Sequence, residues 1–146
     1  SDPIVTQSKT RLRPKYRHYS GVIVDVFYDH FLAKNWNDYH PRPLPDFARQ
    51  TYRTIESFDS ILPKEVGYML PFMIKGNWLV NYAKTEGIHQ AHSGMARRTP
   101  YESKMDEATH DLVQFYDLFK IEFDTYFPLL SSHCKTWITQ NTHDRA

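Results

Sequence analysis

With 146 residues, the chain is long enough for one domain with a buried core, and its hydrophobic content of 40% and aromatic content of 15% are typical of globular proteins. The formal net charge of +1 argues against binding to polyanions through overall charge, so we expect no nucleic-acid partner. No run approaches the roughly 20 apolar residues that span a bilayer, and a single cysteine, Cys134, can form no disulfide within the chain. These features predict a cytoplasmic protein with no membrane partner.

The N-terminal segment carries five cations at alternate positions, Lys9, Arg11, Arg13, Lys15 and Arg17. On a helix this alternation spreads the charge round the axis, which is typical of a solvated face. The alternative is a docking surface for an acidic partner or a phosphate group. A second basic pair, Arg97 and Arg98, follows a predicted helix, where cations also stabilise the helix dipole. All seven are candidate partner-binding residues.

Residues 20–36, SGVIVDVFYDHFLAKNW, predict a helix that is central in the fold. The run is longer than a typical strand, and it is apolar nearly all round. It nevertheless contains Asp25, Asp29 and His30. The two aspartates are four residues apart and share one face, whereas His30 lies about 100° further round the helix.

Asp25, Asp29 and His30 are our candidate catalytic and metal-ligating residues. Carboxylate and imidazole groups together suit a divalent ion that activates water, and hard carboxylate oxygens favour Mn²⁺ or Mg²⁺. In the alternative interpretation, the aspartates pair with arginines or tyrosines and His30 is a hydrogen-bonded core residue. The residues alone leave both interpretations open.

The remaining sequence predicts helices and no sheet, because glycine is scarce and no Asn-Gly or Asp-Gly hairpin signal occurs. Asp46 is a predicted N-cap, and Thr99 with Pro100 predicts the start of a long helix that runs to about residue 126. The expected fold class is all-α, a compact bundle of six to seven helices. We expect one domain over residues 1–130 and a polar C-terminal end over residues 131–146, with a disordered tail from residue 139.

Three segments, SKTRLRPKYRHYSGVIVDVFYDHFLAKNW, GNWLVNYAKTEGI and GMARRT in this order, resemble the acyl carrier protein phosphodiesterases. The resemblance runs over residues 3–130. It implies an all-α fold like that of HD-domain metal hydrolases, and hydrolysis that removes 4′-phosphopantetheine from holo acyl carrier protein. It also implies manganese or another divalent ion as cofactor, held by Asp25, Asp29 and His30. Acyl carrier proteins are small and acidic, so the basic residues would steer them.

The resemblance also implies a further N-terminal segment with acidic and histidine ligands, which this chain lacks, and Asp2 stands where a histidine is often seen. We therefore expect the 146 residues alone to be inactive or nearly so, and expect a second copy of the chain to cover apolar faces left open. Two other functions remain open. One is an HD-like phosphohydrolase of a small nucleotide, and the other is a non-catalytic helical interaction domain.

Overall fold

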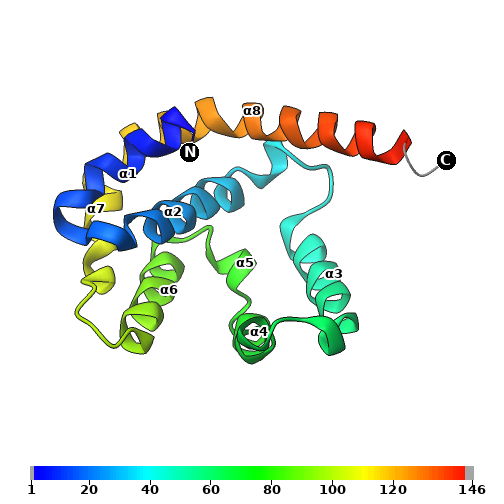
Figure 1. The fold of residues 1–146 in the computed structure, drawn as a ribbon, viewed down its shortest axis with the longest axis horizontal. Coiled ribbons are helices and arrows are strands. Elements are labelled where there is room, and N and C mark those ends of the chain that lie inside the picture. Colours follow the sequence, from blue (N-terminus) through cyan, green and yellow to red (C-terminus); the bar gives the residue numbers. More distant parts are fainter. Residues whose placement is uncertain (1, 144–146) are drawn as a thin grey trace.

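The computed structural model describes residues 2–143, and every regular element within that range is helical (Figure 1). The all-α prediction is confirmed. Seven α-helices have seven or more residues, and they are accompanied by the single-turn α5 and four 3-10 turns. The bounds are α1 Pro3–Tyr16, η1 Arg17–Tyr19, α2 Ser20–Lys34, η2 Trp36–Asp38, α3 Leu44–Ser57, η3 Asp59–Ile61, α4 Lys64–Gly76, α5 Trp78–Asn81, α6 Thr85–Arg98, η4 Met105–Glu107, α7 Ala108–Gln114 and α8 Tyr116–His143.

Helix α2 lies in the middle of the molecule and packs against α1, α5, α6 and α8 (Figure 1). Ile23, Val24, Phe27 and Phe31 are fully buried, which confirms the central helix predicted from residues 20–36. Aromatic edges join it to α8, with 5.1 Å between the ring centroids of Phe27 and Phe119. This contact network holds the candidate site residues of α2 in fixed positions.

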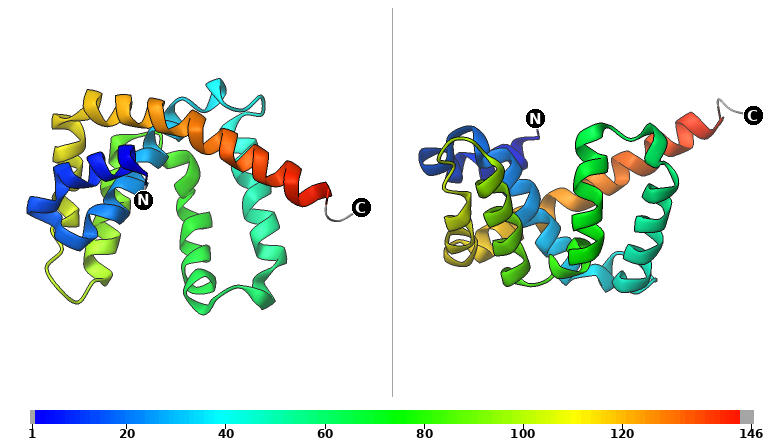
Figure 2. Two further views of the ribbon diagram at one scale, coloured as in Figure 1. Left: turned by 45° about the horizontal axis from the view of Figure 1, so that its top comes forward. Right: turned by 90° about the horizontal axis from the view of Figure 1, so that it is seen from below.

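The helices divide into a packed part and an open part. The core is formed mainly by α1, α2, α6, α7 and the first half of α8. Helices α3 and α4, joined by η3, project away from this core, and the C-terminal half of α8 extends beyond it (Figure 2). Several large apolar side chains are exposed there.

Two predicted helix starts are wrong. Helix α3 begins at Leu44, so Asp46 lies in its first turn and pairs with Arg49. Thr99 has an extended backbone, with φ of −87° and ψ of 129°, as the following Pro100 favours, and so it ends α6, whereas α7 begins only at Ala108. Between them, Lys104 adopts a left-handed backbone conformation with φ of 61°, which turns the chain into η4.

The C-terminal end also differs from the prediction. Helix α8 continues to His143, so residues 139–143 are helical where we expected a disordered tail. Residues 144–146 lie outside the described residues. Among the helices that the structure describes, none has the length and apolar character needed to cross a membrane.

Candidate functional site

Helix α2 places the three predicted site residues in two different surroundings. Asp25 and Asp29 lie on a solvent-accessible face, whereas the side chain of His30 is buried, with 1% exposure. Helix geometry explains the separation, because adjacent residues are rotated by about 100° about the axis. The carboxylates and the imidazole therefore face different parts of the molecule.

His30 is hydrogen-bonded at both ring nitrogens. Its Nδ1 lies 2.8 Å from the carbonyl oxygen of Tyr82, and its Nε2 lies 2.9 Å from the hydroxyl of Tyr116. Since a carbonyl can only accept, Nδ1 carries the hydrogen and Nε2 accepts from Tyr116. Burial lowers the pKa of His30, which favours this neutral form. His30 thus links α2 to the end of α5 and to α8, as in the core-histidine interpretation.

Asp29 lies at the edge of a small, mostly apolar pocket. The pocket has a volume of about 130 Å³, and its walls include Trp36, Phe47, Leu79 and Tyr82. Asp29 still contacts solvent, but crowding by these walls, together with the neighbouring Asp25 carboxylate, raises its pKa to about 6. A carboxyl group with this pKa can accept or release a proton near neutral pH.

Asp25 lies one helical turn from Asp29 and beside Lys9 of α1. Partial burial raises the pKa of Asp25, and the Lys9 ammonium opposes that rise. The Lys9 side chain passes over Gly21, where its Cε lies 3.7 Å from the position that a Cβ would take. Lys9 therefore belongs to the surroundings of Asp25.

Asp25, Asp29 and His30 do not form a metal centre. Within residues 2–143, no group of three His, Cys, Asp or Glu side chains is placed to hold an ion. His30 uses both nitrogens inside the fold, so of the three candidates only the Asp25 and Asp29 carboxylates can meet an ion. The three residues do not fit the predicted three-ligand site, and the Mn²⁺ or Mg²⁺ cofactor stays a prediction.

Tyr82 stands between Asp29 and the second basic pair. It lines the pocket beside Asp29, and it also lines a cavity of about 470 Å³ that Arg97 and Arg98 share. Burial raises the pKa of Tyr82 to about 12, with a further contribution from Asp29. The Tyr82 side chain therefore borders both the acidic face of α2 and the basic end of α6.

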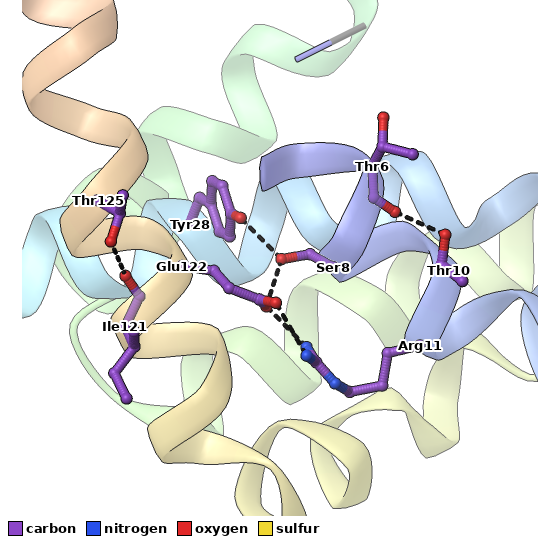
Figure 3. A network of polar contacts seen from close by, with 8 residues as sticks. All are labelled: Thr6, Ser8, Thr10, Arg11, Tyr28, Ile121, Glu122 and Thr125. Carbon is purple, nitrogen blue, oxygen red and sulfur yellow. Dashed lines mark hydrogen bonds and ion pairs between the residues drawn. The ribbon is translucent and has the colours of Figure 1, made fainter. Parts of the chain in front are cut away.

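Arg11 is held in a buried polar network (Figure 3). Its guanidinium donates two hydrogen bonds to Glu122, at 2.7 and 2.8 Å. Glu122 also accepts from the Ser8 hydroxyl at 2.7 Å, so Tyr28 must be the donor in its own 2.7 Å bond to Ser8. The network joins α1, α2 and α8, and Arg11 is therefore committed to the fold.

The other N-terminal cations do not form one continuous basic surface. Lys15 lies 3.5 Å from Glu107 and 3.8 Å from Asp111. Arg13 and Arg17 are exposed and have no ion-pair partner among residues 2–143. Of the five, these two are the cations that an acidic partner could reach most directly.

Two residues of these surroundings, Glu122 and Tyr82, were not predicted from the sequence. Glu122 is 7% exposed and lies between Phe119 and Phe123 on α8. An acid on the helix face marked by Phe119 and Phe123, four residues apart, is consistent with a buried, paired carboxylate, and that pattern was present in the sequence. Tyr82 offered no comparable signal, because its position depends on the junction between α5 and α6.

Comparison with known proteins adds to this geometry. The model of the acyl carrier protein phosphodiesterase family matches residues 1–130. A protein named acyl carrier protein phosphodiesterase from Photorhabdus laumondii is 30% identical to this chain, and the alignment covers 88% of this chain and 65% of that protein. A protein of the same name from Yersinia pestis is 28% identical, and the alignment covers 88% of this chain and 67% of that protein. A further relative of that name, from Enterobacter sp. strain 638, is 27% identical over 91% of this chain and 69% of its own.

The chain therefore spans about two thirds of the length of these curated relatives. No solved structure matches it. The family match covers α1 to α7 and the first half of α8, including the face that carries Asp25 and Asp29. The chain belongs to the acyl carrier protein phosphodiesterase family.

Proposed function

We propose that the protein hydrolyses the phosphodiester that joins 4′-phosphopantetheine to a serine of acyl carrier protein. The observation that carries this proposal is the family match over residues 1–130, since relatives aligned over the same region bear the name of that activity. The accessible Asp29 carboxyl supports it, because its pKa of about 6 suits proton transfer near neutral pH.

In this proposal Asp29 takes a proton from a water molecule that attacks phosphorus. The new bond joins the water oxygen to phosphorus, and the bond from phosphorus to the serine oxygen breaks. The serine oxygen leaves with the proton that Asp29 took from the water, which returns Asp29 to its ionised form, so the products are the apo carrier and 4′-phosphopantetheine. Asp25 acts through Asp29, because its negative charge favours the protonated form of that carboxyl.

Carrier docking is assigned to exposed cations. Arg13 and Arg17 of the N-terminal segment, with Arg97 and Arg98 at the end of α6, are exposed and can attract an acidic protein. Arg11 is left out because it is bonded to Glu122. A cytoplasmic location stays a prediction, as does an oligomeric state.

The test is to incubate the natural protein with holo acyl carrier protein, with and without Mn²⁺, and to weigh the carrier by mass spectrometry. We expect loss of the phosphopantetheine mass, and at least a hundredfold slower loss with Asp29→Asn, the low end of the effect of removing an acid–base group. Asp117→Asn is the matched control, since Asp117 is exposed on α8. A requirement for Mn²⁺ would support the cofactor prediction.

Two results would contradict the proposal. Full activity in Asp29→Asn would remove Asp29 from the reaction. An unchanged carrier mass under every condition would favour a nucleotide phosphohydrolase if nucleotides are cleaved, and a non-catalytic helical domain if they are not.

A further inference from the structure

A groove with one basic end and one apolar end runs between α4 and α6. The basic end is the 470 Å³ cavity lined by Lys75, Arg97 and Arg98. The apolar end is an adjoining cavity of about 450 Å³, with Tyr68, Met69, Phe72 and Trp78 in its walls. Phe72, Trp78 and Arg98 line both cavities, so the two are continuous.

The basic end concentrates positive charge without a compensating acid. No carboxylate lines that cavity, and within residues 2–143 its three cations form no ion pair. Both guanidinium groups come close to Gly94, with Arg98 Nη1 at 3.2 Å and Arg97 Nη2 at 3.8 Å from the position that a Cβ would take. Arg97 and Arg98 lie in the last turn of α6 and Lys75 lies in the last turn of α4, so each helix dipole favours its own cations, and the fold brings the two helix ends to one cavity.

The junction of the two ends offers a neutral donor. The Trp78 indole packs against Gly76, where its Nε1 lies 2.9 Å from the position that a Cβ would take. Its N–H has no acceptor among the described residues, so it can donate to a ligand at the point where basic and apolar walls meet. Glu65 and Lys64 stand together at the apolar end, where their charges offset one another.

We propose that this groove binds organic phosphate monoesters, with the phosphate at Lys75, Arg97 and Arg98 and the organic chain along Tyr68, Phe72 and Trp78. A phosphate monoester carries nearly two negative charges at pH 7, whereas a phosphodiester carries one. A cavity with three cations and no acid therefore favours the monoester. A roughly tenfold preference corresponds to about 1.4 kcal/mol of additional Coulomb energy.

This inference has a consequence that rests on the proposed function. Hydrolysis of the carrier phosphodiester turns a diester into a monoester, 4′-phosphopantetheine. The groove would hold this product more tightly than the diester from which it came, so the product inhibits further turnover.

Binding is measured on the chain itself, without carrier and without turnover. The probes are 4′-phosphopantetheine, its methyl diester, pantetheine and inorganic phosphate, and the readout is the indole N–H signal of Trp78 in NMR spectra. We expect 4′-phosphopantetheine to shift this signal and to bind roughly tenfold more tightly than the diester. Pantetheine should bind at least tenfold more weakly, and binding of the monoester should weaken below its second pKa of about 6.

Variants separate the groove from general surface charge. Arg97→Ala and Arg98→Ala should each weaken monoester binding about tenfold, the effect of losing one charge-assisted contact. Arg53→Ala is the control, because Arg53 is exposed on α3 and lines neither cavity. Circular dichroism shows whether each variant keeps its helices.

Three outcomes would overturn the inference: equal affinity for monoester and diester, equal affinity for pantetheine, or an equal loss of binding in Arg53→Ala. The outcome is independent of catalysis. A chain that binds the monoester but cleaves no carrier supports the groove and contradicts the proposed function. A chain that cleaves carrier but does not bind the monoester supports the proposed function and contradicts the groove.

Discussion

The two halves of α8 lie in very different surroundings. In the first half, Phe119 and Phe123 are nearly fully buried against α2. In the second half, Leu129, Trp137 and Ile138 are each more than half exposed, although they are as apolar as the buried side chains. One continuous helix therefore passes from a packed core to an open surface, and the free energy of folding must be concentrated at its N-terminal end.

Replacing a phenylalanine by alanine should show the largest difference in unfolding free energy between the packed core and the open part of the molecule. Phe31→Ala removes a fully buried ring that contacts Tyr116 and Phe123, and we expect it to cost about 4 kcal/mol of unfolding free energy. Phe58→Ala, at the end of α3, removes a ring that is 50% exposed, and we expect a cost below about 1 kcal/mol. Urea unfolding followed by circular dichroism measures both, and similar costs would show that the open part is packed as well as the core.

An ion pair provides the second comparison, within α8 itself. Glu122→Gln leaves Arg11 in a partly buried place without its carboxylate, so we expect a loss of about 3 kcal/mol. Asp124 lies two residues after Glu122 and forms an exposed ion pair with Lys120. Asp124→Asn breaks this pair and should lower the unfolding free energy by no more than about 0.5 kcal/mol.

Replacing both partners of the buried pair tests this interpretation. If the cost comes from an uncompensated charge, Arg11→Met together with Glu122→Gln should recover part of the stability lost in Glu122→Gln alone. Equal losses in Glu122→Gln and Asp124→Asn would contradict the assignment of Arg11 to the fold.

The same contrast explains what the sequence could and could not predict. A long apolar run such as residues 20–36 predicts a central helix because its hydrophobicity does not depend on its neighbours. Asp25 and Asp29 mark one face of that helix and His30 lies about 100° from it, but a helix that is apolar nearly all round does not show which of these positions faces solvent. The sequence therefore could not show that His30 points into the core while Asp29 stays accessible.

Loops and helix ends were predicted less well for a related reason. Thr99 and Pro100 have the residue types of a helix start, but Pro100 also favours an extended backbone in the residue before it, and the extended Thr99 ends α6. The turn that follows depends on a left-handed Lys104, a conformation that lysine does not favour by itself. Tertiary contacts of Met105 and Ala108, both buried, decide where α7 begins.

A buried histidine should make the packed part sensitive to acid. His92 is fully buried beside Phe27, and neither ring nitrogen has a hydrogen-bond partner among the described residues. Burial, together with the charge of nearby His89, lowers its pKa from the ordinary 6.5 to about 4. The unfolded chain thus binds a proton more readily, so stability is complete above pH 6.5 and is lost as the pH falls through about 4.

Between pH 7.5 and pH 5 this difference should lower the unfolding free energy by about 2 kcal/mol. His92→Leu removes the titrating group and should flatten the dependence by that amount. The lowered pKa of His30 also decreases stability at low pH, and the raised pKa of Asp29 increases it. Both groups remain in His92→Leu, so their effects cancel when the pH profiles of the variant and the wild-type chain are subtracted. Parallel pH profiles for the two proteins would contradict the prediction.

The smallest effect on stability is expected at the exposed end of α8. Trp137 and Ile138 are 57% and 56% exposed, so Trp137→Glu or Ile138→Glu should change the unfolding free energy by less than about 0.5 kcal/mol. Their effect should appear in self-association, because adjacent exposed apolar side chains favour contact with a second copy of the chain. Sedimentation velocity across a range of concentrations should show association that weakens in both variants. Thr139→Glu adds the same charge to a neighbouring polar position and should leave association unchanged, whereas a wild-type chain that stays monomeric throughout would show that this open surface does not bind its own copy.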